Sequence, residues 1–208
     1  MKIQVKEVTK VYKGQTVLKN VSITVEEGQC VGLIGHNGSG KSLLLKVICG
    51  FIKADEGSVT VGKQTIIHGT NYIKEAGVII EQADFIPYLS GLENLQLLAN
   101  IQKKIPLTEV EYYLEKVGLG QTGKKKYKHY SLGMKQRLRI AQSIMEDPQV
   151  LILDEPFNGL DKEGVADILK LLIEAKSAGK TMIVTSHDQG HIDQLADKIY
   201  ELESGVVL

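Results

Sequence analysis

The chain has 208 residues, which is enough for one compact domain with a sizeable core. Its 25 Lys and Arg residues balance 25 Asp and Glu residues, so no global positive field favours nucleic acid or anionic lipid as a partner. The start of the chain lacks the apolar core of a signal peptide, no apolar run is long enough to cross a bilayer, and the two cysteines lie in apolar surroundings, so we expect a cytoplasmic protein with reduced thiols.

The first 82 residues predict strands around a single helix. Alternating β-branched residues predict two long strands, and short apolar runs predict buried ones. The helix follows a glycine-rich loop, and Gly50 is its expected C-terminal stop. The expected strands are 2–12, 16–25, 29–35, a pair within 57–67, and 76–82, with the helix over 41–50.

The rest of the chain changes character twice. Helical apolar spacing dominates from about residue 83 to about residue 146. Strands and helices then alternate again, with strands expected at 150–154, 181–186, 198–202 and 205–208 and helices at 162–179 and 188–196. This pattern predicts an α/β fold with a P-loop NTPase (RecA-like) core, an antiparallel β subdomain and an inserted α-helical subdomain. We expect a single domain, 1–208, whose core comprises about 1–82 and 147–208, with a helical subdomain of about 83–146.

The most specific motif is the glycine-rich loop, which reads GHNGSGKS and matches G-x-x-x-x-G-K-[ST] between a predicted strand and a predicted helix. Glycines let the backbone wrap closely around phosphates, and the helix N-terminus adds partial positive charge. Lys41 is expected to reach the β- and γ-phosphates of ATP, and Ser42 to ligate Mg²⁺. His36 occupies a variable position of the motif and has no predicted chemical role. The predicted nucleotide-binding residues here are Gly35, His36, Asn37, Gly38, Ser39, Gly40, Lys41, Ser42 and Leu43.

A second motif, VLILDEP, is an apolar strand that ends in two acids. Such strand ends carry ligands in parallel sheets. Asp154 is expected to hold Mg²⁺, and Glu155 to orient and deprotonate the attacking water. A second acid directly after the first favours hydrolysis over simple nucleotide storage.

These motifs, together with YSLGMKQR at 130–137, resemble the signature and Walker B segments of the ABC ATPases, the nucleotide-binding subunits of ATP-binding-cassette transporters. The resemblance covers essentially the whole chain. It implies that Tyr12 stacks on adenine, that Val17 also contacts the nucleotide, and that His187 contacts the γ-phosphate. Lys41, Glu155 and His187 are therefore the predicted catalytic residues.

The same resemblance implies a head-to-tail dimer, either of two copies or of this chain with a related cassette. ATP would lie between the phosphate loop of one copy and the signature turn of the other. Ser131 and Gly133 would face the γ-phosphate of the partner's nucleotide, and Asp161 would cross the interface. An integral membrane permease on another chain would be the second partner, which would hold this chain on the cytoplasmic face of the membrane. The apolar cluster at 85–88 is expected either to dock the permease or to pack internally.

Two departures from the usual family pattern narrow the resemblance. The signature has Leu132 and Met134 where the family usually has Gly and Gln. The glutamine that usually helps to bind Mg²⁺ is replaced by Glu81, with Gln82 as the alternative. Both features resemble export ATPases found with bacitracin and lantibiotic-peptide resistance. They predict export of a peptide antibiotic or a similar amphiphile, with ATP and Mg²⁺ as cofactors.

A soluble ABC ATPase that acts on nucleic acid or ribosomes is the alternative. The repair and chromosome-organising types place long coiled coils between their two ATPase halves, and ribosome-associated members generally carry two cassettes. This chain shows neither feature. Together with the zero net charge, this predicts that nucleic acid is not a partner.

Overall fold

A mostly parallel sheet forms the centre of the computed structural model, which describes residues 1–81 and 84–208. Its strands are Cys30–Ile34 (β3), Ala76–Ile79 (β6), Val150–Leu153 (β7), Thr181–Thr185 (β8), Lys198–Glu203 (β9) and Val206–Val207 (β10). Their order is β10-β9-β3-β8-β7-β6, and only the β9–β10 pair is antiparallel. Strands β7 and β8 are buried throughout, which explains why they read as continuous apolar runs instead of alternating ones.

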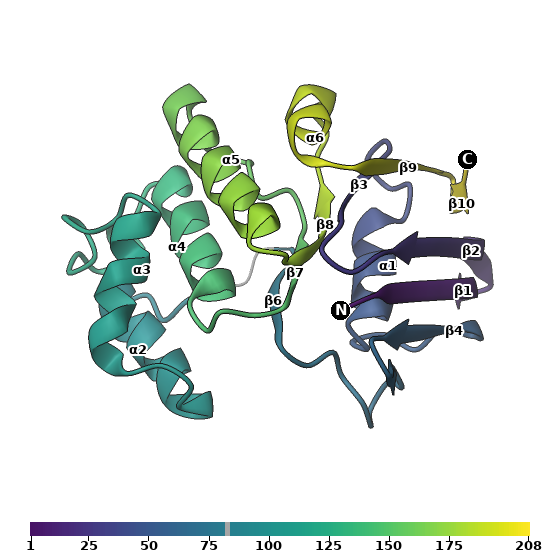
Figure 1. Cartoon of the computed structure of the whole chain (residues 1–208), viewed down its shortest axis with the longest axis horizontal. Helices are drawn as coiled ribbons and strands as arrows, with labels where there is room; N and C mark the ends of the chain where they lie inside the picture. The colour runs from purple at the N-terminus through teal and green to yellow at the C-terminus, as the bar shows by residue number, and fades with distance from the viewer. Residues whose placement is uncertain (82–83) are drawn as a thin grey trace.

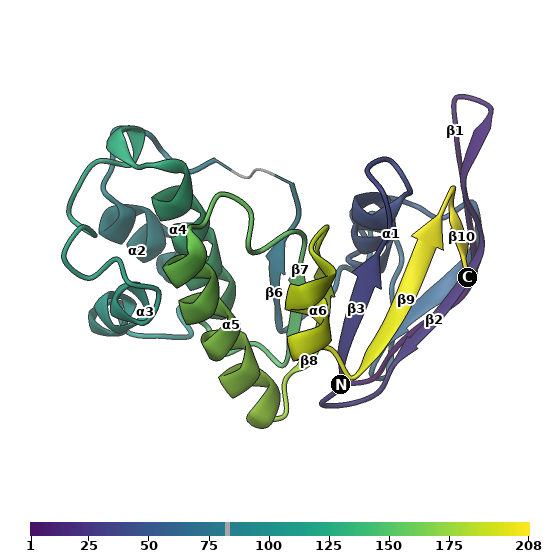
Figure 2. The ribbon, with the colours of Figure 1, turned by 90° about the horizontal axis from the view of Figure 1, so that it is seen from above.

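A second, antiparallel sheet packs beside the first. It comprises Ile3–Tyr12 (β1), Gln15–Val25 (β2), Glu56–Val61 (β4) and Gln64–Thr65 (β5), in the order β2-β1-β4-β5. Helix α1 (Lys41–Ile48) lies between the two sheets (Figures 1 and 2). It ends at the predicted point, because Gly50 follows its C-cap with a positive φ of 82°.

The remaining helices lie on the other side of the parallel sheet (Figure 2). Three of them cover it directly: α4 (Leu132–Ile144), α5 (Lys162–Ser177) and α6 (Gln189–Leu195). The others extend outward: α2 (Gly91–Gln102), α3 (Val110–Lys116) and the short 3₁₀ turns η1 (Leu107–Glu109) and η2 (Tyr127–His129). Helix α2 begins at a capping box in which Ser90 and Glu93 exchange side-chain-to-backbone hydrogen bonds. The predicted α/β architecture with two subdomains is confirmed.

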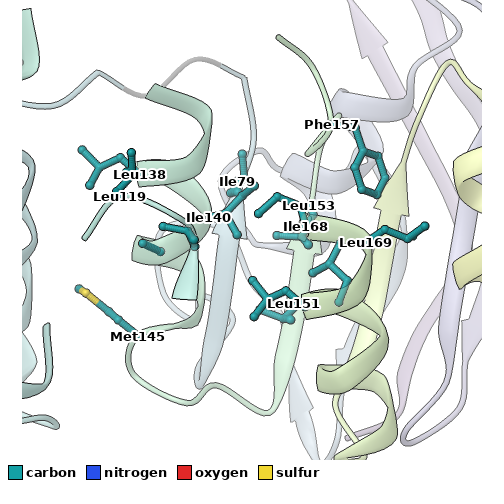
Figure 3. Close-up of a cluster of buried hydrophobic side chains, with 14 of the residues drawn as sticks. Ile79, Leu119, Leu138, Ile140, Met145, Leu151, Leu153, Phe157, Ile168 and Leu169 are labelled. Carbon is teal, nitrogen blue, oxygen red and sulfur yellow. The ribbon is translucent and has the colours of Figure 1, made fainter. Parts of the chain in front are cut away.

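Two buried clusters hold these layers together. One joins α1 to both sheets. The other joins the helical insert, α5 and the opposite face of the parallel sheet. Figure 3 shows Ile140 of α4 on the side of Ile79 of β6, and Leu138 of α4 beside Leu119 of the insert. Helix α4 is therefore anchored directly on the parallel sheet, so the turn that begins it is held in a fixed place relative to the strand ends.

The predicted subdomain limits, 1–82, 83–146 and 147–208, remain predictions, and residues 82 and 83 lie outside the described part. The two cysteines are predicted to be reduced thiols in apolar surroundings. Cys30 and Cys49 are both buried and unpaired, and burial raises the pKa of each thiol to about 12. Both thiols therefore stay protonated and pack as small apolar side chains.

Candidate nucleotide site

The phosphate loop connects the end of β3 to the start of α1, as the motif predicts. Gly35 and Gly40 have φ values of 145° and 108°, which favour glycine. A Cβ at Gly35 would collide with the carbonyl oxygen of Leu202, and one at Gly40 would lie 2.9 Å from Leu18 Cδ2. Glycine is therefore required at both positions by backbone conformation and by close packing of the loop against Leu202 and Leu18.

The interior of this loop fits a phosphate group. Lys41 is only 7% exposed, and its Nζ donates to the carbonyl oxygens of Gly35 at 2.6 Å and His36 at 3.1 Å. The buried hydroxyl of Ser39 has no hydrogen-bond partner among the described residues. No side chain caps the N-terminus of α1, so its first N–H groups stay available to an anion.

The acidic end of β7 lies beside β8. The register pairs Leu153 with Val184, which places Asp154 next to Thr185. Thr185 Oγ1 donates to Asp154 Oδ1 at 2.7 Å and accepts the Glu155 N–H at 2.9 Å. Thr185 thus orients both acids. Thr185 is not among the residues predicted from the sequence, although a threonine at the end of a neighbouring parallel strand is a usable signal once the strand order is known.

Glu155 and His187 come from different strand ends and meet in the structure. His187 Nδ1 lies 2.9 Å from Glu155 Oε2, and the His187 N–H donates to the same oxygen at 3.3 Å. Glu155 also has a φ of 50°, an uncommon conformation for a residue other than glycine. A cavity of about 380 Å³ opens beside this pair; its lining is Ile34, Gly35, His36, Asn37, Ser186, His187, Gln189 and Glu201. The histidine and the phosphate loop therefore face one space.

Glu81 follows β6 and forms an ion pair with Lys46 of α1. Lys46 lies one helical turn beyond Ser42, so the pair ties the end of β6 to the helix that carries the phosphate loop. This pairing is not among the contacts predicted from the sequence. Gln82, the alternative residue for the metal role, lies outside the described residues.

The signature turn is built differently from the phosphate loop. Ser131 is the N-cap of α4, and its Oγ accepts the Met134 N–H at 3.2 Å. Leu132, which replaces the usual glycine, is the first residue of α4, and its side chain lies over Gly159, where a Cβ would meet it. Gly133 lies near the Gly159 carbonyl oxygen, 3.0 Å from where a Cβ would be. The leucine is thus accommodated by helical backbone and a neighbouring glycine.

The other predicted residues lie around these segments. Asp161 is the N-cap of α5, and its Oδ1 accepts the Gly164 N–H at 2.9 Å. Val17 approaches the loop, since its carbonyl oxygen lies 3.5 Å from the position of a Cβ on Gly40. Tyr12 is 59% exposed at the end of β1.

Helices α1 and α4 lie on opposite sides of the parallel sheet (Figures 1 and 2). The phosphate loop shares a cavity with His187, which contacts Glu155, while the signature turn begins the helix on the other side of the sheet. Among the described residues, no helix combines the length and apolar character that a bilayer crossing requires. The fold and the site together define a P-loop nucleoside triphosphatase with an accessory helical subdomain.

Comparison with known proteins gives the family. The model of the family described as "ABC transporter" matches residues 18–158, more than half of the chain. The chain belongs to the ABC transporter family, as an ATP-binding ATPase subunit.

Similar proteins cover nearly the whole chain. The uncharacterized ABC transporter ATP-binding protein YybJ of Bacillus subtilis is 40% identical over 98% of this chain and 93% of its own length. The bacitracin transport ATP-binding protein BcrA of Enterococcus faecalis is 38% identical over 98% of this chain, which spans 67% of BcrA. The lantibiotic transport ATP-binding protein SrtF of Streptococcus pyogenes is 33% identical over 99% of this chain and 89% of its own length.

A solved structure shows the same fold in a product complex. The dimeric, post-hydrolysis structure of the ATP-binding cassette MJ0796 bound to ADP and Pi has a TM-score of 0.90 and 28% identity, and it covers 99% of this chain and 96% of its own. The predicted fold and ATPase class are confirmed by these comparisons.

Proposed function

We propose that this ATPase subunit drives the export of a peptide antibiotic or a similar amphiphile through a separate membrane permease, docked on the cytoplasmic face of the membrane. The observation that carries this proposal is the likeness to bacitracin and lantibiotic transport ATP-binding proteins over 98% and 99% of the chain. Within the expected docking cluster, Phe85 packs against Tyr127, whereas Tyr88 is 67% exposed. The permease contact is therefore assigned to the exposed part of the cluster.

In the proposed reaction, the phosphate loop binds ATP through its backbone N–H groups, and Lys41 compensates charge on the β- and γ-phosphates. Ser42 and Asp154 are the proposed Mg²⁺ ligands, with Glu81 as a third. Mg²⁺, when bound, neutralises charge on the β- and γ-phosphate oxygens. Support comes from the phosphate-compatible loop and from the position of Asp154 at the carboxyl end of β7, in the same parallel sheet.

Glu155 is the proposed general base, which takes a proton from the attacking water; positioned bases contribute about 10²- to 10⁴-fold. His187 Nδ1 lies 2.9 Å from the Glu155 carboxylate, and His187 is the proposed contact of the γ-phosphate; the cavity that it shares with the phosphate loop supports this role. Tyr12 is exposed and available for stacking on adenine.

Two half-sites on one chain support the proposed ATP-dependent dimer. The signature turn lies across the sheet from the phosphate loop of its own chain, so Ser131 and Gly133 are assigned to a nucleotide held by a partner copy. Asp161, at the start of α5, is assigned to the same interface. The MJ0796 neighbour is itself dimeric.

The test compares cells that produce the wild-type chain or Glu155→Gln, each with the permease encoded beside it. Export predicts that wild type raises the minimum inhibitory concentration of bacitracin or of a lantibiotic severalfold, whereas Glu155→Gln leaves the cells sensitive although the protein still sediments with membranes. Equal sensitivity of both strains to both peptide classes would contradict the proposed cargo. Sedimentation with ribosomes instead of membranes would favour the non-transport alternative.

A further inference from the structure

Two buried polar side chains, Gln136 and Arg139, connect the catalytic turn to Asp84, whose own side chain is exposed. Gln136 of α4 is 5% exposed, and its Nε2 donates to the carbonyl oxygens of Pro156 at 3.0 Å and Glu155 at 3.3 Å. Its Oε1 accepts from Arg139 Nη1 at 3.2 Å. Carbonyl oxygens can only accept and a guanidinium can only donate, so these partners fix which way the amide faces.

Arg139 extends this connection to Asp84. The guanidinium is buried at 5% exposure, and its Nη2 lies 3.8 Å from Asp84 Oδ1. Tyr127 donates its hydroxyl hydrogen to the same oxygen at 3.2 Å. Burial raises the pKa of Tyr127, so the phenol stays protonated and remains a donor. Asp84 is three residues beyond Glu81, the proposed metal ligand.

The backbone at Glu155 needs such support. Its φ of 50° is a strained conformation that persists only where the surroundings determine it. Thr185 holds its N–H, and Gln136 together with the Asn158 N–H holds its carbonyl oxygen. Loss of the Gln136 contact would let the turn relax and would move the carboxylate away from its working position.

We propose that Gln136 is a positioning residue for Glu155, and that Arg139 and Asp84 orient Gln136, so that these contacts set the rate of ATP hydrolysis. The inference rests on the assignment of Glu155 as the general base. Gln136 and Arg139 share α4 with the signature turn, so one helix connects the turn at its start, the proposed base and Asp84.

The test uses Gln136→Met, which keeps side-chain length, and Arg139→Met, which keeps an apolar stem; both remove the polar contacts. Misplacement of a base by about 1 Å lowers rates by up to about 100-fold, so kcat should fall about 10- to 100-fold in Gln136→Met and less in Arg139→Met. The Kd of ATP should stay within about twofold in both, because neither residue belongs to the phosphate loop. Asp84→Asn should lower kcat severalfold in the wild-type chain but not in the Arg139→Met background.

Lys180→Met is the matched control. It removes an ion pair with Asp147, 2.7 Å in length, just beyond the opposite end of α4, without touching the catalytic turn. Its kcat should match wild type below its melting temperature. A purely structural role for Gln136 predicts instead that Gln136→Met and Lys180→Met behave alike, with lower melting temperatures and no separate effect on kcat, and this result would overturn the proposal.

The Glu155→Gln background separates the assignment of Glu155 as the general base from the positioning role of Gln136. Single-turnover hydrolysis by Glu155→Gln should be very slow, and adding Gln136→Met should slow it no further, since the base that Gln136 positions is already gone. A further tenfold loss would overturn the positioning role of Gln136. Full turnover by Glu155→Gln would overturn both the base assignment and the positioning role of Gln136. An inactive Glu155→Gln together with wild-type kcat in Gln136→Met would overturn the positioning role alone.

Discussion

The phosphate loop and the signature turn both end in a helix N-terminus, but they prepare it in opposite ways. The loop enters α1 through Gly40 with no side-chain cap, and its N–H groups remain available. The turn enters α4 through Ser131, whose oxygen already accepts the Met134 N–H. The first arrangement suits a binding cradle that encloses phosphate. The second suits a preformed surface that contacts a phosphate bound by another chain. The proposed shared site requires one region of each kind.

The largest expected difference between these regions comes from one methyl group in each. In Gly40→Ala, a Cβ is forced onto a residue with a φ of 108° and lies 2.9 Å from Leu18 Cδ2. Such strain costs about 1–3 kcal/mol, so ATP binding by the single chain should weaken about tenfold or more. Isothermal titration calorimetry with Mg-ATP measures this affinity.

Gly133→Ala is the counterpart in the signature turn. Gly133 has helical backbone within α4, and a Cβ would meet only the Gly159 carbonyl oxygen, at 3.0 Å. ATP binding by the single chain should stay unchanged, while ATP-dependent dimer formation should weaken, because relief of the close contact with Gly159 shifts the signature turn. Equal losses of ATP affinity in the two variants would contradict the division between cradle and surface.

A smaller effect is expected from the cap itself. Ser131→Ala removes the acceptor for the Met134 N–H and should cost about 1 kcal/mol, a fall of about 2–4 °C in melting temperature. Ser131→Asp keeps the cap but adds negative charge, so it should preserve the melting temperature and still prevent ATP-dependent pairing. Thermal unfolding with and without Mg-ATP separates these effects; pairing by Ser131→Asp at wild-type strength would argue against phosphate contact at this residue.

The cradle was more predictable than the contacts around it. The glycines and the lysine of the phosphate loop form a motif that is recognisable in the sequence. Gly35, Gly40 and Lys41 could therefore be predicted as loop residues from the sequence alone. The acids at the end of β7 could be assigned too, because an apolar strand that ends in charge is a local pattern.

Contacts that depend on strand order or on packing of distant segments left no such pattern. Thr185 became recognisable only when β8 was seen beside β7. The Lys46–Glu81 pair and the contact between Arg139 and Asp84 join segments 35 and 55 residues apart. Nothing in the local spacing of these residues indicates that they meet, because their contacts follow from how α1 and α4 pack on the sheet.

The central claim, that the signature turn completes a site on a partner chain, is tested most directly by the solution mass of Glu155→Gln with and without Mg-ATP, measured by light scattering after size exclusion. Removal of the base should preserve ATP binding and block hydrolysis, so the mass should double with Mg-ATP, and Ser131→Arg in the same background should abolish the doubling. A chain that binds ATP and remains a monomer, or a dimer indifferent to Ser131→Arg, would contradict the shared site.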